Sequence, residues 1–102
     1  MVIWSAPARL DLKSIYDYIA ADSTFYASKV VQDIVEKSER LNDFPLAGRM
    51  VPEIENNNIR EMIIYPYRLI YRVTPDQIEI LALIHGKRDF SSSDIATSGL
   101  QP

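Results

Sequence analysis

The residues best suited to chemistry are the only histidine of the chain and several basic residues near it in the sequence. His85 is followed closely by Lys87 and Arg88, and Arg68 and Arg72 precede it. An imidazole can accept or donate a proton near neutral pH, and guanidinium groups stabilise negative charge on a phosphate. Together they would suit RNA cleavage by attack of a 2′-hydroxyl. If the chain is a nuclease, the candidate catalytic residues are His85, Arg68, Arg72 and Arg88.

A purely structural interpretation of the same residues is favoured when they are considered alone. In a strand over residues 67–74, alternation places Arg68 and Arg72 on one face. Cross-strand charge pairs are common on sheet surfaces, so these arginines would pair with Glu61 and Glu79. His85 would then simply end the last strand.

Other chemistries find little support in the sequence. There is no cysteine, only one histidine and only three glycines. We therefore expect no disulfide, no metal site, no phosphate-binding glycine loop and no cofactor. The six tyrosines are expected to lie mostly at core or sheet positions, where they would serve packing.

Composition and charge indicate one ordinary globular domain. The chain has 102 residues, of which 47% are apolar, and its net charge is −3. That balance counts against broad affinity for nucleic acid, although a small basic patch remains compatible with it. The sequence shows neither a signal peptide nor the roughly 20 apolar residues that span a bilayer. We expect a soluble, cytoplasmic protein.

Two helices and four strands are predicted from hydrophobic periodicity. Ser5 can cap a first helix that contains Pro7 in its first turn and ends near Ala21. A second helix, capped within residues 22–24, ends before Pro45. Strands are predicted at residues 2–5, 59–64, 67–74 and 78–85, with a loop at 45–58 and a mobile polar tail at 91–102.

The expected fold is α+β, a single domain over residues 1–90 with the order β-α-α-β-β-β. If the chain reverses at every step, the first strand is antiparallel to the last and pairs with it. The helical hairpin covers one face of this antiparallel sheet, and the other face is left open. In the last strand, alternation predicts a core face and an opposite face. The core face holds Ile78, Ile80, Ala82 and Ile84, and the opposite face holds Glu79, Leu81, Leu83 and His85.

An ordered set of short motifs resembles one known family over about residues 2–90. The set is Trp4-Ser5-x-x-Ala8-x-x-Asp11-Leu12-x-x-Ile15-x-x-Tyr18-Ile19, Leu41, Phe44-Pro45-x-x-Gly48-Arg49, Arg60, Tyr67-Arg68-Leu69-Ile70-Tyr71-Arg72, Ile80 to His85, and Arg88-Asp89. It resembles the ParE branch of the ParE/RelE toxin superfamily. The strand, hairpin and meander order predicted above agrees with the fold of that family.

The resemblance implies a toxin that forms a hetero-oligomer with a cognate, ParD-like antitoxin. ParE-type toxins are understood to poison DNA gyrase and arrest growth, whereas RelE-type toxins cut mRNA on the ribosome. Residues 59–90 hold five Lys or Arg against four Asp or Glu, and Phe90 stands where a nuclease tends to carry tyrosine. These features favour a gyrase poison over a catalyst. A RelE-like nuclease and a non-toxic relative that only binds antitoxin remain the alternatives.

The binding surface is predicted on the open sheet face and at the end of the last strand. An acidic amphipathic segment of the antitoxin would add a helix in a groove or a strand at the sheet edge. The candidates for antitoxin or target binding are Arg60, Arg68, Ile70, Arg72, Leu81, Leu83, His85, Lys87 and Arg88.

Overall fold

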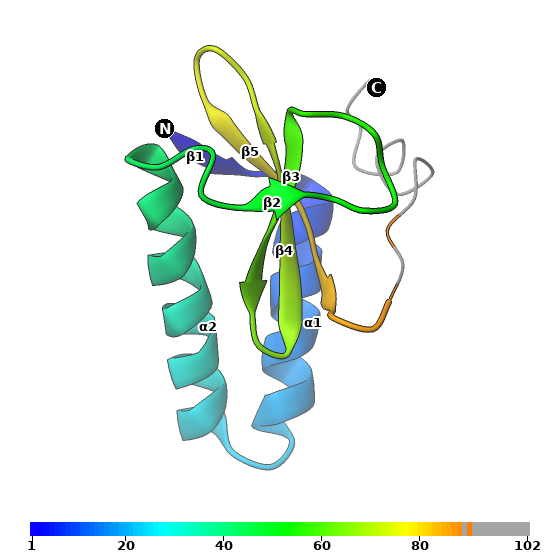
Figure 1. Cartoon of the computed structure of the whole chain (residues 1–102). Coiled ribbons are helices and arrows are strands. Elements are labelled where there is room, and N and C mark those ends of the chain that lie inside the picture. Colours follow the sequence, from blue (N-terminus) through cyan, green and yellow to red (C-terminus); the bar gives the residue numbers. More distant parts are fainter. Residues whose placement is uncertain (89, 91–102) are drawn as a thin grey trace.

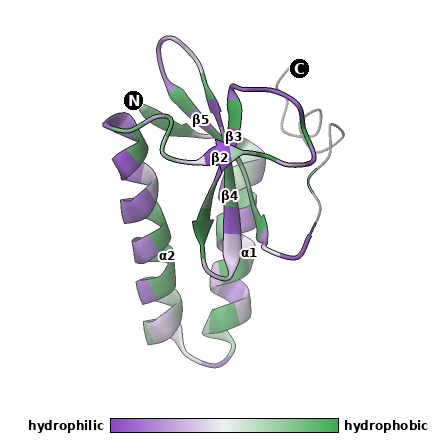
Figure 2. Ribbon diagram, in the orientation of Figure 1, coloured by the Kyte–Doolittle hydropathy of each residue, from purple (hydrophilic) through white to green (hydrophobic). Residues whose placement is uncertain are grey.

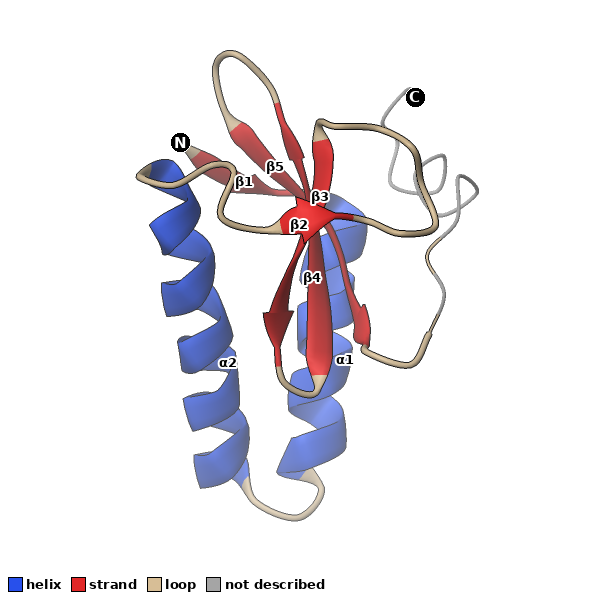
Figure 3. Ribbon diagram, in the orientation of Figure 1, coloured by secondary structure: helices blue, strands red, loops and turns tan. Residues whose placement is uncertain are grey.

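A computed structural model describes residues 1–88 and 90 (Figures 1 and 3). The predicted tail at 91–102 lies outside the described residues. Two long helices stand side by side on one face of a five-stranded sheet, which confirms the predicted α+β fold. The elements in chain order are β1 (Val2–Trp4), α1 (Ala6–Ala20), α2 (Thr24–Glu39), the short 3-10 helix η1 (Arg40–Asn42), β2 (Arg49–Met50), β3 (Ile59–Ile64), β4 (Tyr67–Val73) and β5 (Ile78–His85).

Both long helices begin at the serine caps that the sequence predicts. The Ser5 hydroxyl accepts a hydrogen bond from the Ala8 N–H at 3.2 Å, and the Ser23 hydroxyl accepts one from the Tyr26 N–H at 3.1 Å. Each cap satisfies one of the backbone donors that a helix start leaves unpaired. The apolar stripes of the two helices face the sheet. On α2, the side turned away from the sheet is largely hydrophilic (Figure 2).

The direction of β1 differs from the prediction. The sheet order is β1-β5-β4-β3-β2, and β3, β4 and β5 form the expected antiparallel meander. However, β1 pairs with β5 in parallel, with Val2 opposite Ile78 and Trp4 opposite Ile80. The cause is β2, a two-residue strand inside the predicted loop at 45–58, which pairs antiparallel with β3. It adds one reversal of the chain that the sequence pattern does not reveal.

A β-bulge changes the faces of β5 midway. Ile70 pairs with Ala82, whereas Tyr71 pairs with Ile80, so Leu81 is an extra residue. An extra residue shifts the alternation of a strand by one, and every later side chain changes face. Ile80 therefore lies on the helix side as predicted. The assignments beyond the bulge are wrong: Leu83 and His85 lie on the helix side, and Ala82 and Ile84 lie opposite.

Each face of the sheet has its own core, so the outer face is not open as predicted. On the helix side, Leu69, Tyr71 and Ile80 pack against α1 and α2. On the outer side, residues 51–58 and Phe90 lie over the sheet. The outer core comprises Val51, Ile59, Ile70, Leu81, Ala82, Ile84 and Phe90, with Ile54 packed against it. β4 and β5 thus contribute side chains to both cores.

Candidate functional site

Arg68 lies at the centre of a buried ion network on the outer face of the sheet. Its side chain is only 7% exposed. Its two terminal nitrogens donate to both carboxylate oxygens of Glu53, at 2.8 and 2.9 Å, and one of them donates to Glu61 at 2.6 Å. Arg68 also donates to the backbone carbonyl of Arg88 at 2.7 Å. The guanidinium therefore links the 51–58 loop and the turn after β5 to the sheet.

Glu53 is strongly stabilised in its charged form by this network. Hydrogen bonds from Arg68, together with one from the Phe90 N–H, lower the pKa of Glu53 to about 2. The same carboxylates raise the pKa of Arg68. The side chain of Glu61 is fully buried and pairs with Arg49 at 2.9 Å as well as with Arg68. The predicted pairing of Arg68 with Glu61 is thus confirmed.

His85 lies on the opposite face of the sheet from Arg68. Its neighbour on β4 is Tyr67, whose ring meets the imidazole edge to face at a centroid distance of 6.4 Å. Its Nδ1 accepts a hydrogen bond from the Lys87 N–H at 3.2 Å. The imidazole borders a shallow hollow of about 460 Å³ with Ile15 and Tyr18 of α1. The structure therefore does not bring the candidate acid or base together with Arg68.

The remaining predicted site residues are dispersed. Arg60 donates to the carbonyls of Gly48 and Asn57, at 2.8 and 3.1 Å, and Arg72 is half-buried opposite Glu79 on β5. Lys87 and Arg88 are exposed in the turn after β5. The apolar candidates Ile70, Leu81 and Leu83 are buried in the two cores.

Several residues form structural contacts that sequence reasoning did not assign to them. The hydroxyl of Tyr71 accepts from the Gly48 N–H and donates to the Pro45 carbonyl, both at 2.9 Å. Burial raises the pKa of this hydroxyl. At the bulge, the Ser5 hydroxyl donates to the Leu81 carbonyl and an Asp11 carboxylate oxygen accepts from the Leu83 N–H. Ser5, Asp11, Gly48 and Tyr71 all belong to the motifs that carry the family resemblance, which was the available signal.

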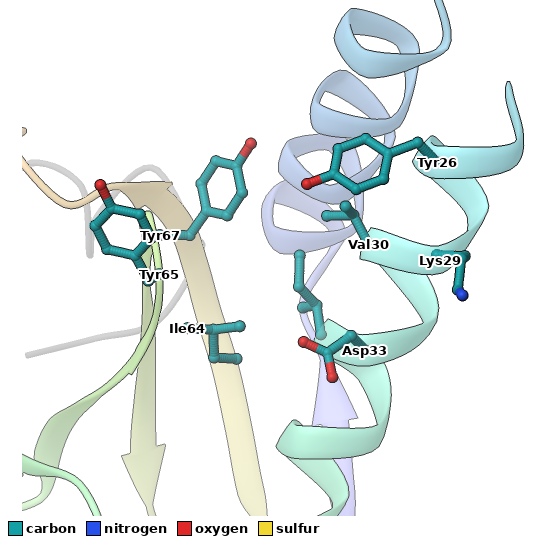
Figure 4. A pocket seen from close by; sticks show the side chains of 8 residues that line it. Tyr26, Lys29, Val30, Asp33, Ile64, Tyr65 and Tyr67 are labelled. Carbon is teal, nitrogen blue, oxygen red and sulfur yellow. The ribbon is translucent and has the colours of Figure 1, made fainter. Parts of the chain in front are cut away.

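A cluster of tyrosines surrounds the turn between β3 and β4 and the end of the helical hairpin. Tyr65 is 91% exposed, Tyr18 is 81% exposed and Tyr26 is 60% exposed, so the expectation that the tyrosines serve mostly packing is wrong for these three. Between α2 and the β3–β4 turn lies a hollow of about 490 Å³. Tyr26 and Tyr67 face one another across it (Figure 4). Its lining is Tyr26, Lys29, Val30, Asp33, Ile34, Ile64, Tyr65 and Tyr67.

Residues 1–88 and 90 contain no group of three or more His, Asp or Glu side chains placed to hold a metal ion. Over the same residues, no helix has the length and apolar character needed to cross a membrane.

Comparison with known proteins identifies the family. Residues 2–90 match the family described as the ParE toxin of the type II toxin–antitoxin system parDE. The chain belongs to this toxin family. A solved chain of the chromosomal ParDE system from P. aeruginosa is 31% identical to the toxin, with a TM-score of 0.68 over 82% of this chain and 92% of that one.

More distant relatives include a RelE toxin. Toxin RelE2 of Caulobacter vibrioides is 27% identical over 88 residues, which are 85% of this chain and 96% of that protein. A chain of the YoeB–YefM complex from Staphylococcus aureus shares the fold with a TM-score of 0.53 at 19% identity, over 83% of this chain and 94% of that one. The toxin is therefore a type II toxin of the ParE/RelE superfamily.

Proposed function

We propose that this toxin inhibits DNA gyrase and is neutralised by a cognate, ParD-like antitoxin. The observation that carries the proposal is the separation of His85 from Arg68 by the sheet. A nuclease that used both would need them within reach of one phosphate. Arg68 is instead buried between Glu53 and Glu61, where it holds the fold. The likeness to the ParDE chain of P. aeruginosa supports the same branch of the superfamily.

A RelE-like, ribosome-dependent nuclease is the second candidate. The similarity to Toxin RelE2 favours it, as does the exposed cationic turn after β5, where Lys87 and Arg88 follow His85. In a nuclease of this kind, His85 would transfer the proton without help from Arg68. The His85→Ala variant tests this idea because the imidazole is exposed and lies outside both cores.

Two parallel assays of the purified toxin distinguish the candidates. One measures supercoiling of relaxed plasmid by purified gyrase, and the other measures mRNA cleavage on translating ribosomes. We expect loss of supercoiling with intact mRNA, restored supercoiling when purified antitoxin is added, and no effect of His85→Ala. Ribosome-dependent cuts that His85→Ala abolishes would overturn the proposal. Activity in neither assay, with antitoxin still bound, would indicate a non-toxic relative.

A further inference from the structure

The second half of β3 has a free edge. β4 pairs with β3 along its whole length, from Ile59 to Ile64, whereas β2 pairs only with Arg60 and Glu61. The Ile59 carbonyl accepts from the Val51 N–H and so points away from β4. Backbone groups alternate along a strand of an antiparallel pair, so those of Ile63 point the same way. Within the described residues no strand lies beside them.

Apolar surface lies on both sides of this free edge. On the helix side is the hollow of about 490 Å³, where Val30 of α2 faces Ile64 and Tyr67 (Figure 4). Ile34 of α2 also lines this hollow. On the outer side, Ile63 is 55% exposed. A strand added beside Ile63 would therefore place alternate side chains in the hollow and over Ile63. Backbone pairing would supply affinity and the hollow would supply selectivity.

The charges near this edge favour an acidic occupant. Lys29 stands at the rim of the hollow, over the ring of Phe25 at 5.3 Å, and Arg60 donates hydrogen bonds to the carbonyl oxygens of Gly48 and Asn57. The salt bridges among the described residues include neither cation. Asp33, the acidic residue of the rim, already pairs with Lys37 at 3.1 Å. A second copy of the chain would bring the same cations to the edge, whereas an acidic segment complements them.

We propose that an extended, acidic segment of the antitoxin adds to the sheet as a strand beside Ile63, with an apolar side chain in the hollow between α2 and the β3–β4 turn. This inference rests on the proposed function for the identity of its partner. It moves the binding surface away from the outer sheet face, which the 51–58 loop and Phe90 already cover.

Ile63→Pro tests the backbone pairing. Proline removes an N–H that points away from β4 and is tolerated on edge strands, so the meander should persist. The matched control is Ile63→Val, which keeps the N–H and the branched side chain. With the purified antitoxin encoded in the same operon, calorimetry should show affinity at least about tenfold weaker for the proline variant. The valine variant should bind within about twofold of the wild type.

Lys29→Glu tests the charge preference. It should weaken binding about threefold to fivefold at low salt, and the effect should shrink as salt is added. Arg40→Glu is the control because it makes the same charge change in the residue after the last turn of the same helix. That control should leave the affinity unchanged.

If the proline variant fails to fold, amide hydrogen exchange of the wild-type complex provides an independent test of the strand site. The Ile63 amide should exchange at least about a hundredfold more slowly with antitoxin bound. Full-affinity binding without that protection would overturn the strand site and leave the proposed function standing. Absence of any complex would instead overturn the antitoxin partnership itself. Protection of Ile63 by self-association alone would overturn the choice of occupant.

Discussion

The buried ion network around Arg68 gives the sharpest prediction of stability. Arg68→Ala would leave the carboxylate of Glu61 fully buried, with Arg49 as its remaining ion-pair partner among the described residues, and Arg49 is itself 67% exposed. It would also release Glu53, and with it the anchor of the Phe90 N–H. Breaking a buried charge pair from one side costs about 3–5 kcal/mol. We expect a loss of that size in the free energy of unfolding.

Urea unfolding followed by the fluorescence of Trp4, the only tryptophan, measures this loss. The control is the double variant Arg68→Met with Glu61→Leu, which removes both buried charges. Replacement of a buried pair by apolar side chains of similar volume is often neutral. The double variant should therefore be more stable than Arg68→Ala by at least about 2 kcal/mol. A single-variant loss below about 1 kcal/mol, or no recovery in the double variant, would refute the reasoning.

Three further predictions concern stability. Gly48→Ala should lower the free energy of unfolding by at least about 2 kcal/mol, measured by heat or urea, because the added Cβ would stand 2.3 Å from the Glu61 carbonyl oxygen. Gly86→Ala should lower it clearly less, because its added Cβ would lie 3.1 Å from the closest atom. The folded-state pKa of Glu53 lies below its ordinary value of 4.5, so its contribution to stability is present above pH 4.5 and is lost as pH falls toward 2. Unfolding midpoints between pH 7 and pH 2.5 should show this loss in the wild type and a smaller one in Glu53→Gln. Asp11→Ala removes the acceptor of the Leu83 N–H and should cost about 1–3 kcal/mol, whereas an unchanged midpoint would show that water replaces the carboxylate.

The sequence was most informative where local chemistry decides the structure. The serine caps, the apolar stripes of the helices and the β-branched runs each favour one conformation, and both helices and the three meander strands form as predicted. The tertiary features were harder to foresee. β2 is held by long-range pairing with β3 and has no local pattern of its own, so the added reversal of the chain, and the parallel pairing of β1, were missed.

The candidate site was predicted less well because it depends on the bulge. Strict alternation along β5 would place His85 on the face of Arg68, and a single extra residue at Leu81 reverses that result. Nothing in the run Ile80-Leu81-Ala82-Leu83 indicates a bulge, since every side chain is apolar. The groups that hold the bulge are the Ser5 hydroxyl and the Asp11 carboxylate, which come from about seventy residues away. The sequence predicts Ser5 as a helix cap and offers Asp11 only as part of the motif that resembles the family.

The parallel pairing of β1 with β5 also determines when the toxin can finish folding during its synthesis. β1 has only β5 as a neighbour in the sheet, and the two strands lie at opposite ends of the described chain. During synthesis the helical hairpin can form early from local contacts, but β1 must wait until β5 has left the ribosome. Both cores need side chains of β5, so neither can close before then. A chain whose translation stops upstream of β5 cannot complete the sheet. Only chains translated through β5 can therefore form the folded toxin.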